Sequence, residues 1–126
     1  MSLLTLEFVT PDGHTESVTS VEKVVFRRFE ADRDEGAEVG ILPRHAPILI
    51  RVPCSLARYV TGGETTYLAV AGGFAEVRDD HVLVVTPRFD VTGAGPGARE
   101  LAQGLADGWR KGASDFQSAI DRKSVV

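Results

Sequence analysis

The chain has 126 residues, of which 43% are hydrophobic and 25% charged, as in an ordinary soluble globular protein. Its net charge of −4 argues against nucleic-acid binding, because that needs a basic surface to displace phosphate counterions. The single cysteine excludes an internal disulfide, and no apolar run approaches the roughly 20 residues that span a bilayer. The N-terminus also lacks the pattern of a secretory signal, so we expect an unexported chain that meets a membrane only through a partner.

Residues 1–90 are predicted to form a mainly β domain. Apolar and polar residues alternate with a period of two over residues 4–9, as they do in a half-buried strand. Further short runs rich in β-branched and aromatic residues follow, separated by turn sequences such as Pro11-Asp12-Gly13 and Gly62-Gly63. Many short strands at close spacing indicate a sandwich or a barrel.

Within this domain, two adjacent glycines precede an aromatic residue. Gly72 and Gly73 predict a bulge or a close approach of two backbones, since a glycine inside a strand permits both. Phe74 is expected in the core, with a place in an interface as the alternative. Cys54 is expected to act as a small, buried or half-buried hydrophobic residue.

A change of pattern after residue 90 predicts a linker over 91–97 and a helix over 98–126. Glycines and a proline punctuate the linker. Apolar residues then recur at helical spacing on one face: Leu101, Ala102, Leu105, Trp109, Phe116 and Ile120. Three interior glycines, Gly104, Gly108 and Gly112, each cost about 1 kcal/mol relative to alanine. We therefore expect the helix to dock on something, or to exchange between docked and loose states.

No catalytic residue, cofactor site or metal site is predicted. The histidines His14, His45 and His81 each lie beside turn or loop signals and show no ligand spacing. They could still converge in a β-fold, so a small β-barrel metalloenzyme remains one alternative. The glycine-rich segment before the helix is a poor phosphate loop, because Pro96 removes a backbone N–H. A free-standing adaptor whose helix docks an unrelated partner is the other alternative.

Three segments together carry a resemblance to a known family. They read E-V-G-I-L-P-R-H-A-P-I-L over residues 38–49, Y-L-A-V-A-G-G-F-A-E-V over 67–77, and L-E-F-V-T-P over 6–11. The first two closely resemble the G-I-L-P-G-H-A-P-L-L and G-G-F-L-E-V blocks of the epsilon subunit of F-type ATP synthases. The blocks agree in order and spacing, and the resemblance covers about residues 3–89.

The resemblance implies an N-terminal antiparallel β-sandwich of two sheets, followed by a helical segment. It also implies a non-catalytic rotor subunit of the central stalk, which binds the gamma subunit and the polar loops of the c-ring. Ion-driven rotation of the ring would then be coupled to ATP synthesis or hydrolysis, at the cytoplasmic face of the bacterial inner membrane. The contact positions match Glu38 and His45, together with Arg44, which replaces the family's usual glycine. A loop held by two prolines loses little entropy on docking.

The tail departs from the usual family pattern. It is long enough for one helix rather than a two-helix hairpin, and the ATP-binding motif I/L-D-x-x-R-A is matched only at Ile120-Asp121. This truncated pattern is similar to the epsilon subunit of the alternate, N-type bacterial F-type ATPases. The cationic residues Arg110, Lys111, Arg122 and Lys123 are expected to form a regulatory helix surface, able to contact the alpha and beta subunits and slow ATP hydrolysis.

Overall fold

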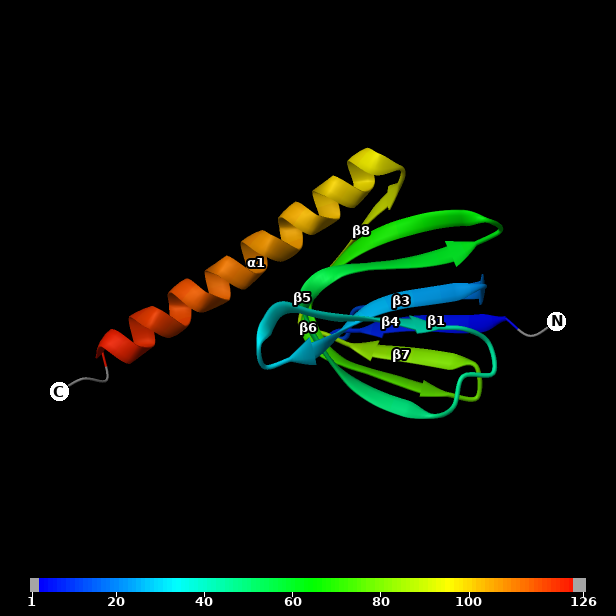
Figure 1. Ribbon diagram of the computed structural model, residues 1–126, viewed down its shortest axis with the longest axis horizontal. Helices are drawn as coiled ribbons and strands as arrows, with labels where there is room; N and C mark the ends of the chain where they lie inside the picture. Colours follow the sequence, from blue (N-terminus) through cyan, green and yellow to red (C-terminus); the bar gives the residue numbers. More distant parts are fainter. Residues whose placement is uncertain (1–2, 124–126) are drawn as a thin grey trace.

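A computed structural model describes the backbone of residues 3–123, and the side chains of these residues except 114–118, 122 and 123. Eight strands precede one helix: β1 (Leu4–Val9), β2 (Thr15–Val21), β3 (Lys23–Glu30), β4 (Arg33–Ile41), β5 (Ile48–Thr61), β6 (Glu64–Arg78), β7 (His81–Val85), β8 (Phe89–Ala94) and α1 (Pro96–Lys123). Figure 1 shows a β-sandwich with α1 running diagonally along one side and continuing past it. The predicted β-then-helix division is confirmed.

The two layers of the sandwich share the long hairpin of β5 and β6. The continuous strand order is β2-β1-β7-β6-β5-β3-β4, with β8 added on β6. The first part of β5 pairs with the last part of β6 in the layer of β7, β1 and β2, whereas the other halves pair in the layer of β8, β3 and β4. The hairpin turn is Gly62-Gly63, both with positive φ, as their sequence predicts.

One strand pair departs from the expected antiparallel arrangement. β1 runs parallel to β7, with Thr5 opposite His81 and Val9 opposite Val85. These strands are distant in sequence, so no tight hairpin forces them to be antiparallel.

The bend that carries β5 and β6 from one layer to the other lies at the predicted glycine pair. Pairing passes from Val52–Gly73 to Cys54–Ala71 and skips one residue on each strand. Gly73 has φ 115°, and a Cβ there would overlap the carbonyl oxygen of Val85. The close backbone approach therefore requires glycine.

The core lies between the two layers. Its largest fully buried side chains include Phe8, Phe26, Leu6, Ile41 and Leu68. A second, smaller cluster joins Ala69 of β6 to Ala102 and Ala106 of α1, with Leu105 and Trp109 packed against it. The predicted apolar helix face is thus only partly right, because Leu101 is 56% exposed. The side chain of Phe116 lies outside the described residues.

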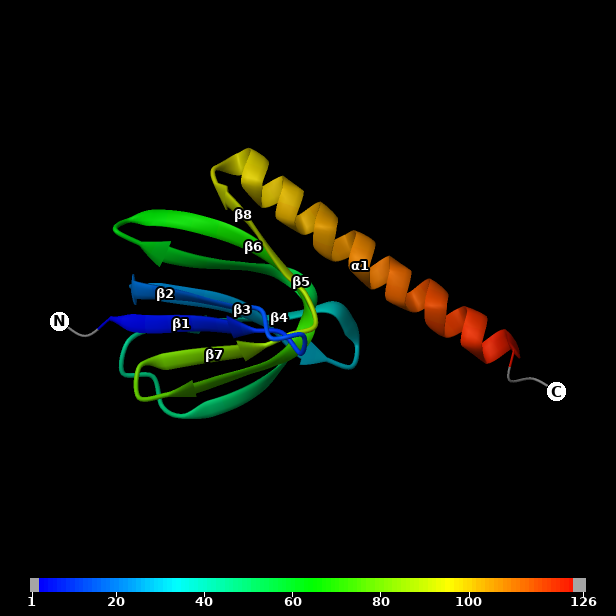
Figure 2. The ribbon, with the colours of Figure 1, turned by 180° about the vertical axis from the view of Figure 1, so that it is seen from behind.

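The linker predicted over 91–97 is wrong. Most of that segment belongs to β8, where Val91 pairs with Leu68 and packs against the core. Helix α1 already begins at Pro96, whose missing N–H costs nothing at the first helical position. Only Gly95 separates strand from helix, and its carbonyl accepts the Arg99 N–H at 3.1 Å. Figure 2 shows β8 turning directly into the first turn of α1.

Candidate interaction surface

The loop between β4 and β5 is held rigidly in place. The N–H of Arg44 donates to the Asp80 carboxylate in the β6–β7 turn at 2.6 Å, and the N–H of His45 donates to the Leu42 carbonyl at 3.2 Å. Pro43 and Pro47 restrict the chain on either side of these bonds. Figure 1 places this loop at the end of the sandwich where β1 begins. It presents exposed side chains from a fixed backbone.

Arg44 adopts a conformation that glycine would accept more easily. Its φ is 67°, in the left-handed region that costs an L-residue about 1 kcal/mol. This is the position at which the resembling family carries glycine. The imidazole of His45 is half-buried, with Nδ1 2.7 Å from the Ala46 carbonyl oxygen. A neutral ring donates from Nδ1 in that geometry, which leaves Nε2 as an acceptor for a partner.

Glu38 lies apart from this loop, on β4 opposite Arg27. Its carboxylate accepts from Arg58 of β5, with Oε1 and Nη2 3.1 Å apart. The Arg58 hydrogen bond, supported by the nearby positive charges of Arg27 and Lys23, holds the pKa of Glu38 below its usual value. Glu38 is therefore ionised at neutral pH and already paired, although it is exposed. The structure shows no hydrogen bond or ion pair between Glu38 and His45, both of which it describes.

An exposed apolar surface covers the outer side of the layer containing β5, β6 and β7. Phe74 is 52% exposed, Leu49 65% and Val85 43%. Phe74 of β6 lies directly opposite Val85 on β7. Two residues further along β6, Glu76 lies on the same face and is opposite Leu49 of β5. We call Leu49, Phe74 and Val85 the outer apolar face. Side chains of this size gathered on one surface indicate a docking site.

The expected place of Phe74 in the core is therefore wrong, and the interface alternative fits its exposure. Ala75 and Val77 are the buried residues of this part of β6, so the alternation of the strand directs Phe74 outward. Both inward positions are apolar in the sequence, so the period-two alternation of this segment is a local signal that Phe74 faces outward.

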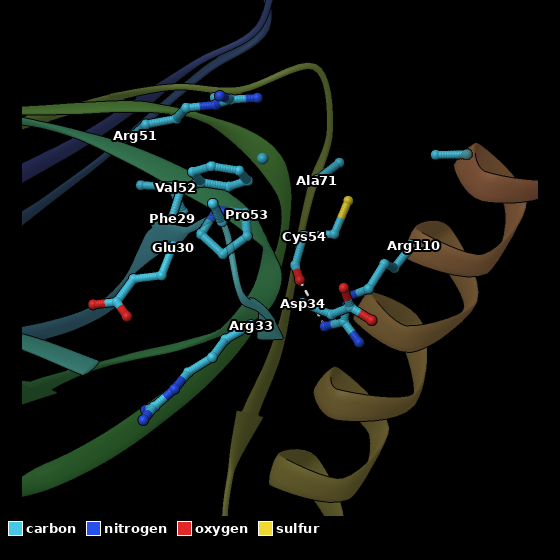
Figure 3. Close-up of a pocket in the computed structure, with 14 residues that line it drawn as sticks. Phe29, Glu30, Arg33, Asp34, Arg51, Val52, Pro53, Cys54, Ala71 and Arg110 are labelled. Carbon is cyan, nitrogen blue, oxygen red and sulfur yellow. Dashed lines mark hydrogen bonds between the residues drawn. The ribbon is translucent and has the colours of Figure 1, made fainter. Parts of the chain in front are cut away.

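A cavity of about 410 Å³ opens where the β3–β4 turn, the bend of β5 and β6, and α1 meet (Figure 3). Phe29 lies under the Arg51 guanidinium, 4.0 Å from it, on one side. On the other side Arg110 donates from Nη2 to the Cys54 carbonyl at 2.7 Å, and its Nη1 pairs with Asp107 at 3.1 Å. Cys54 is half-buried, as expected, and burial raises the pKa of its thiol. The labelled side chains of Arg33 and Glu30 point away from the cavity.

The predicted regulatory residues are not equivalent. Arg110 is engaged with the sandwich, whereas Lys111 is exposed. The side chains of Arg122 and Lys123 lie outside the described residues.

The histidines lie in three different places. His81 begins β7 and contacts Glu7 at 3.3 Å, whereas His14 follows the far end of β1 and stacks on Phe89 at 5.1 Å. His45 belongs to the β4–β5 loop. Among the described residues, no group of histidine, cysteine and acidic side chains is arranged to hold a metal ion. Across the same residues, no helix has the length and apolar character of a membrane span.

Comparison with known proteins identifies the family. The model of the ATP synthase Delta/Epsilon chain, beta-sandwich domain, matches residues 3–90. An ATP synthase epsilon chain of Bacillus mycoides is 32% identical to this chain, and the alignment covers 99% of this chain and 97% of that protein. An epsilon chain of Bacillus thuringiensis is 35% identical over 85% of this chain and 80% of its own length.

Solved structures show the same fold at lower sequence identity. A chain of the Euglena gracilis mitochondrial ATP synthase aligns with 71% of this chain at a TM-score of 0.57 and 20% identity, and this chain spans 54% of its length. A chain from the central stalk and c-ring of the Tetrahymena thermophila mitochondrial ATP synthase also aligns with 71%, at a TM-score of 0.52 and 12% identity, and 66% of its length is covered. The chain belongs to the delta/epsilon family of ATP synthase subunits, whose epsilon chains are non-catalytic members of that complex.

Proposed function

We propose that this chain is a rotor subunit of the central stalk, which couples rotation of a membrane c-ring to ATP synthesis or hydrolysis through the gamma subunit. The observation that carries the proposal is the outer apolar face. A sandwich whose core is closed has no internal use for Phe74 and Leu49 at 52% and 65% exposure. An apolar contact suits a partner that stays bound while the stalk rotates, because the removal of apolar surface from water drives permanent association. We assign this face to gamma.

The second contact in the proposal is the β4–β5 loop, which would meet the polar loops of the c-ring. Arg44 and His45 supply hydrogen-bonding groups there, and the bond from the Arg44 backbone to Asp80 fixes the loop before docking. The loop then loses little conformational entropy on binding, and a stiff loop would transmit torque from the ring. Glu38 adds a carboxylate on β4, where it is ion-paired with Arg58. The subunit would thus lie on the cytoplasmic face of a bacterial plasma membrane, attached only through its complex.

A regulatory role of the helix forms the finer part of the proposal. Exposed Lys111 and the cationic end of α1 would contact the acidic catalytic head of alpha and beta subunits and slow ATP hydrolysis. Assignment to the N-type branch stays a prediction that rests on the single-helix tail.

Binding to the cognate gamma subunit tests the main proposal. We expect the wild-type chain to co-purify with gamma, and Phe74→Asp to lose that binding while keeping its fold by circular dichroism. Leu101→Asp is the matched control, because Leu101 is equally exposed, at 56%, but lies on α1. Wild-type chain that fails to bind gamma would remove the basis of the rotor assignment. If Phe74→Asp binds gamma as tightly as Leu101→Asp and the wild-type chain do, the outer apolar face is not the gamma contact.

A coupling assay tests the loop. In membranes carrying the assembled ATPase, we expect Arg44→Ala combined with His45→Ala to reduce ATP-driven ion pumping per ATP hydrolysed. Unchanged pumping would place the c-ring contact elsewhere on the chain.

A further inference from the structure

The connection between sandwich and helix is short and flanked by hydrogen bonds. Five residues of β8 pair with β6, from Phe89 opposite Val70 to Ala94 opposite Thr66. The Thr92 hydroxyl lies 2.7 Å from the Ala98 carbonyl oxygen in the first turn of α1, and 3.1 Å from the Tyr67 carbonyl oxygen on β6. With only Gly95 between strand and helix, α1 cannot swing away as a body without breaking the contact between Thr92 and Ala98.

The first half of α1 is also packed against the sheet. Ala102 and Ala106 are fully buried against Ala69, which is fully buried as well. Small side chains on both sides bring the helix backbone close to β6, and Leu105 and Trp109 pack around this contact. Detachment would expose all of this surface to water at once.

A pair of polar contacts marks the point at which docking ends. The Arg88 guanidinium covers the Trp109 ring, 4.5 Å from its centre, and Arg110 Nη2 donates to the Cys54 carbonyl at 2.7 Å. Beyond Arg110, Lys111, Gly112 and Ala113 are exposed, and Ile120 is 43% exposed. Figure 1 shows the helix leaving the sandwich over this region.

The interior glycines do not weaken the docked contact. A Cβ placed on Gly104, Gly108 or Gly112 would have nothing within 4 Å outside the helix itself. These residues therefore lie on the side of the helix that faces away from the sheet.

We propose that α1 has two functionally distinct parts. The base, residues 96–110, is a permanent layer of the β-domain that stays docked during function. The arm, residues 111–123, extends beyond the sandwich and is the part of α1 that we assign to contact with another subunit. Any regulation by the tail then acts through the arm and does not require release of the whole helix. The division rests on contacts within this chain and is independent of the rotor assignment.

Hydrogen exchange read by mass spectrometry on the full chain tests the division. We expect the amides of residues 100–110 to be protected to within about tenfold of the paired amides of β6. The amides of residues 116–123 should exchange at least 100-fold faster than those of the base. The same contrast should persist in the assembled ATPase while it hydrolyses ATP. Base amides that exchange as fast as the arm while β6 stays protected, in either sample, would overturn the proposal.

A pair of variants gives a second readout that does not depend on exchange rates. Trp109→Ala removes part of the docking contact, and Gly108→Ala, one residue away on the open side, is the control. If the base belongs to the β-domain, Trp109→Ala lowers the single unfolding midpoint and raises exchange in β6 and β8, whereas Gly108→Ala does neither. An unfolding midpoint and β6 exchange unchanged by Trp109→Ala, with faster exchange confined to α1, would show an independent helix and refute the division.

Discussion

Truncation of Phe74 tests the outer apolar face quantitatively. A phenylalanine side chain presents about 200 Å² of apolar surface, and Phe74 leaves 52% of its surface exposed, so a docked partner would cover about 100 Å². At about 25 cal/mol per Å², Phe74→Ala should weaken binding to gamma by about 2.5 kcal/mol, or about 60-fold in Kd. The isolated variant should unfold close to the wild-type urea concentration, because Phe74 is not part of the buried core.

Isothermal titration calorimetry with purified gamma measures the change in Kd. Leu101→Ala is the matched control, since it removes an equally exposed side chain from α1 and should change Kd by less than about threefold. A Kd for Phe74→Ala within threefold of wild type would refute the assignment of this face to gamma. A loss of folding stability in Phe74→Ala would instead contradict the exposure from which the estimate starts.

Three further changes test the geometry of the sandwich and its loop. Gly73→Ala should lower the free energy of unfolding by at least about 2 kcal/mol, because it adds a backbone overlap to the strain of a φ of 115°. Gly13→Ala, at φ 91° in open space, should lose only about 1 kcal/mol, and equal losses would contradict the close approach at the bend. Arg44→Gly should raise the free energy of unfolding by about 0.5 to 1 kcal/mol in urea titrations, because glycine relieves the left-handed conformation; a decrease would show that the side chain supports the loop. Glu38→Gln should destabilise the chain by less than about 1 kcal/mol at pH 7, since its pair with Arg58 is exposed.

The pH dependence of the Glu38 pair has a definite sign. Its folded pKa is lowered, so the pair stabilises the fold above the unfolded pKa and that stabilisation is lost as pH falls through the folded value. Wild type and Glu38→Gln should therefore differ in urea titrations at pH 7 and converge in acid below both pKa values. A difference that persisted there would show that packing, rather than charge, accounts for the effect of the substitution.

Local patterns sufficed for much of the fold because strand and helix periodicities, and the conformational freedom of glycine, are properties of short segments. The alternation over residues 4–9, the Gly62-Gly63 turn and the glycine bend at Gly72-Gly73 all appear in the structure as predicted. The same reasoning failed at residues 91–97, because glycines that permit flexibility in a linker also permit the bulged pairing of β8 with β6. Whether such a segment is ordered depends on what lies beside it.

For the candidate site, the sequence by itself determined which residues stand in the β4–β5 loop and that prolines stiffen it. Only the tertiary structure decided that Asp80 ties this loop down, that Glu38 is paired with Arg58, and that Phe74 faces outward beside Val85. Likewise, the sequence determined a helix, while the structure decided that it joins the sandwich at Ala102 and Ala106 and leaves it after Arg110. The physical reason is the same in each case. These contacts join residues far apart in the chain, so they exist only once the strands have brought them together, and no local pattern records them.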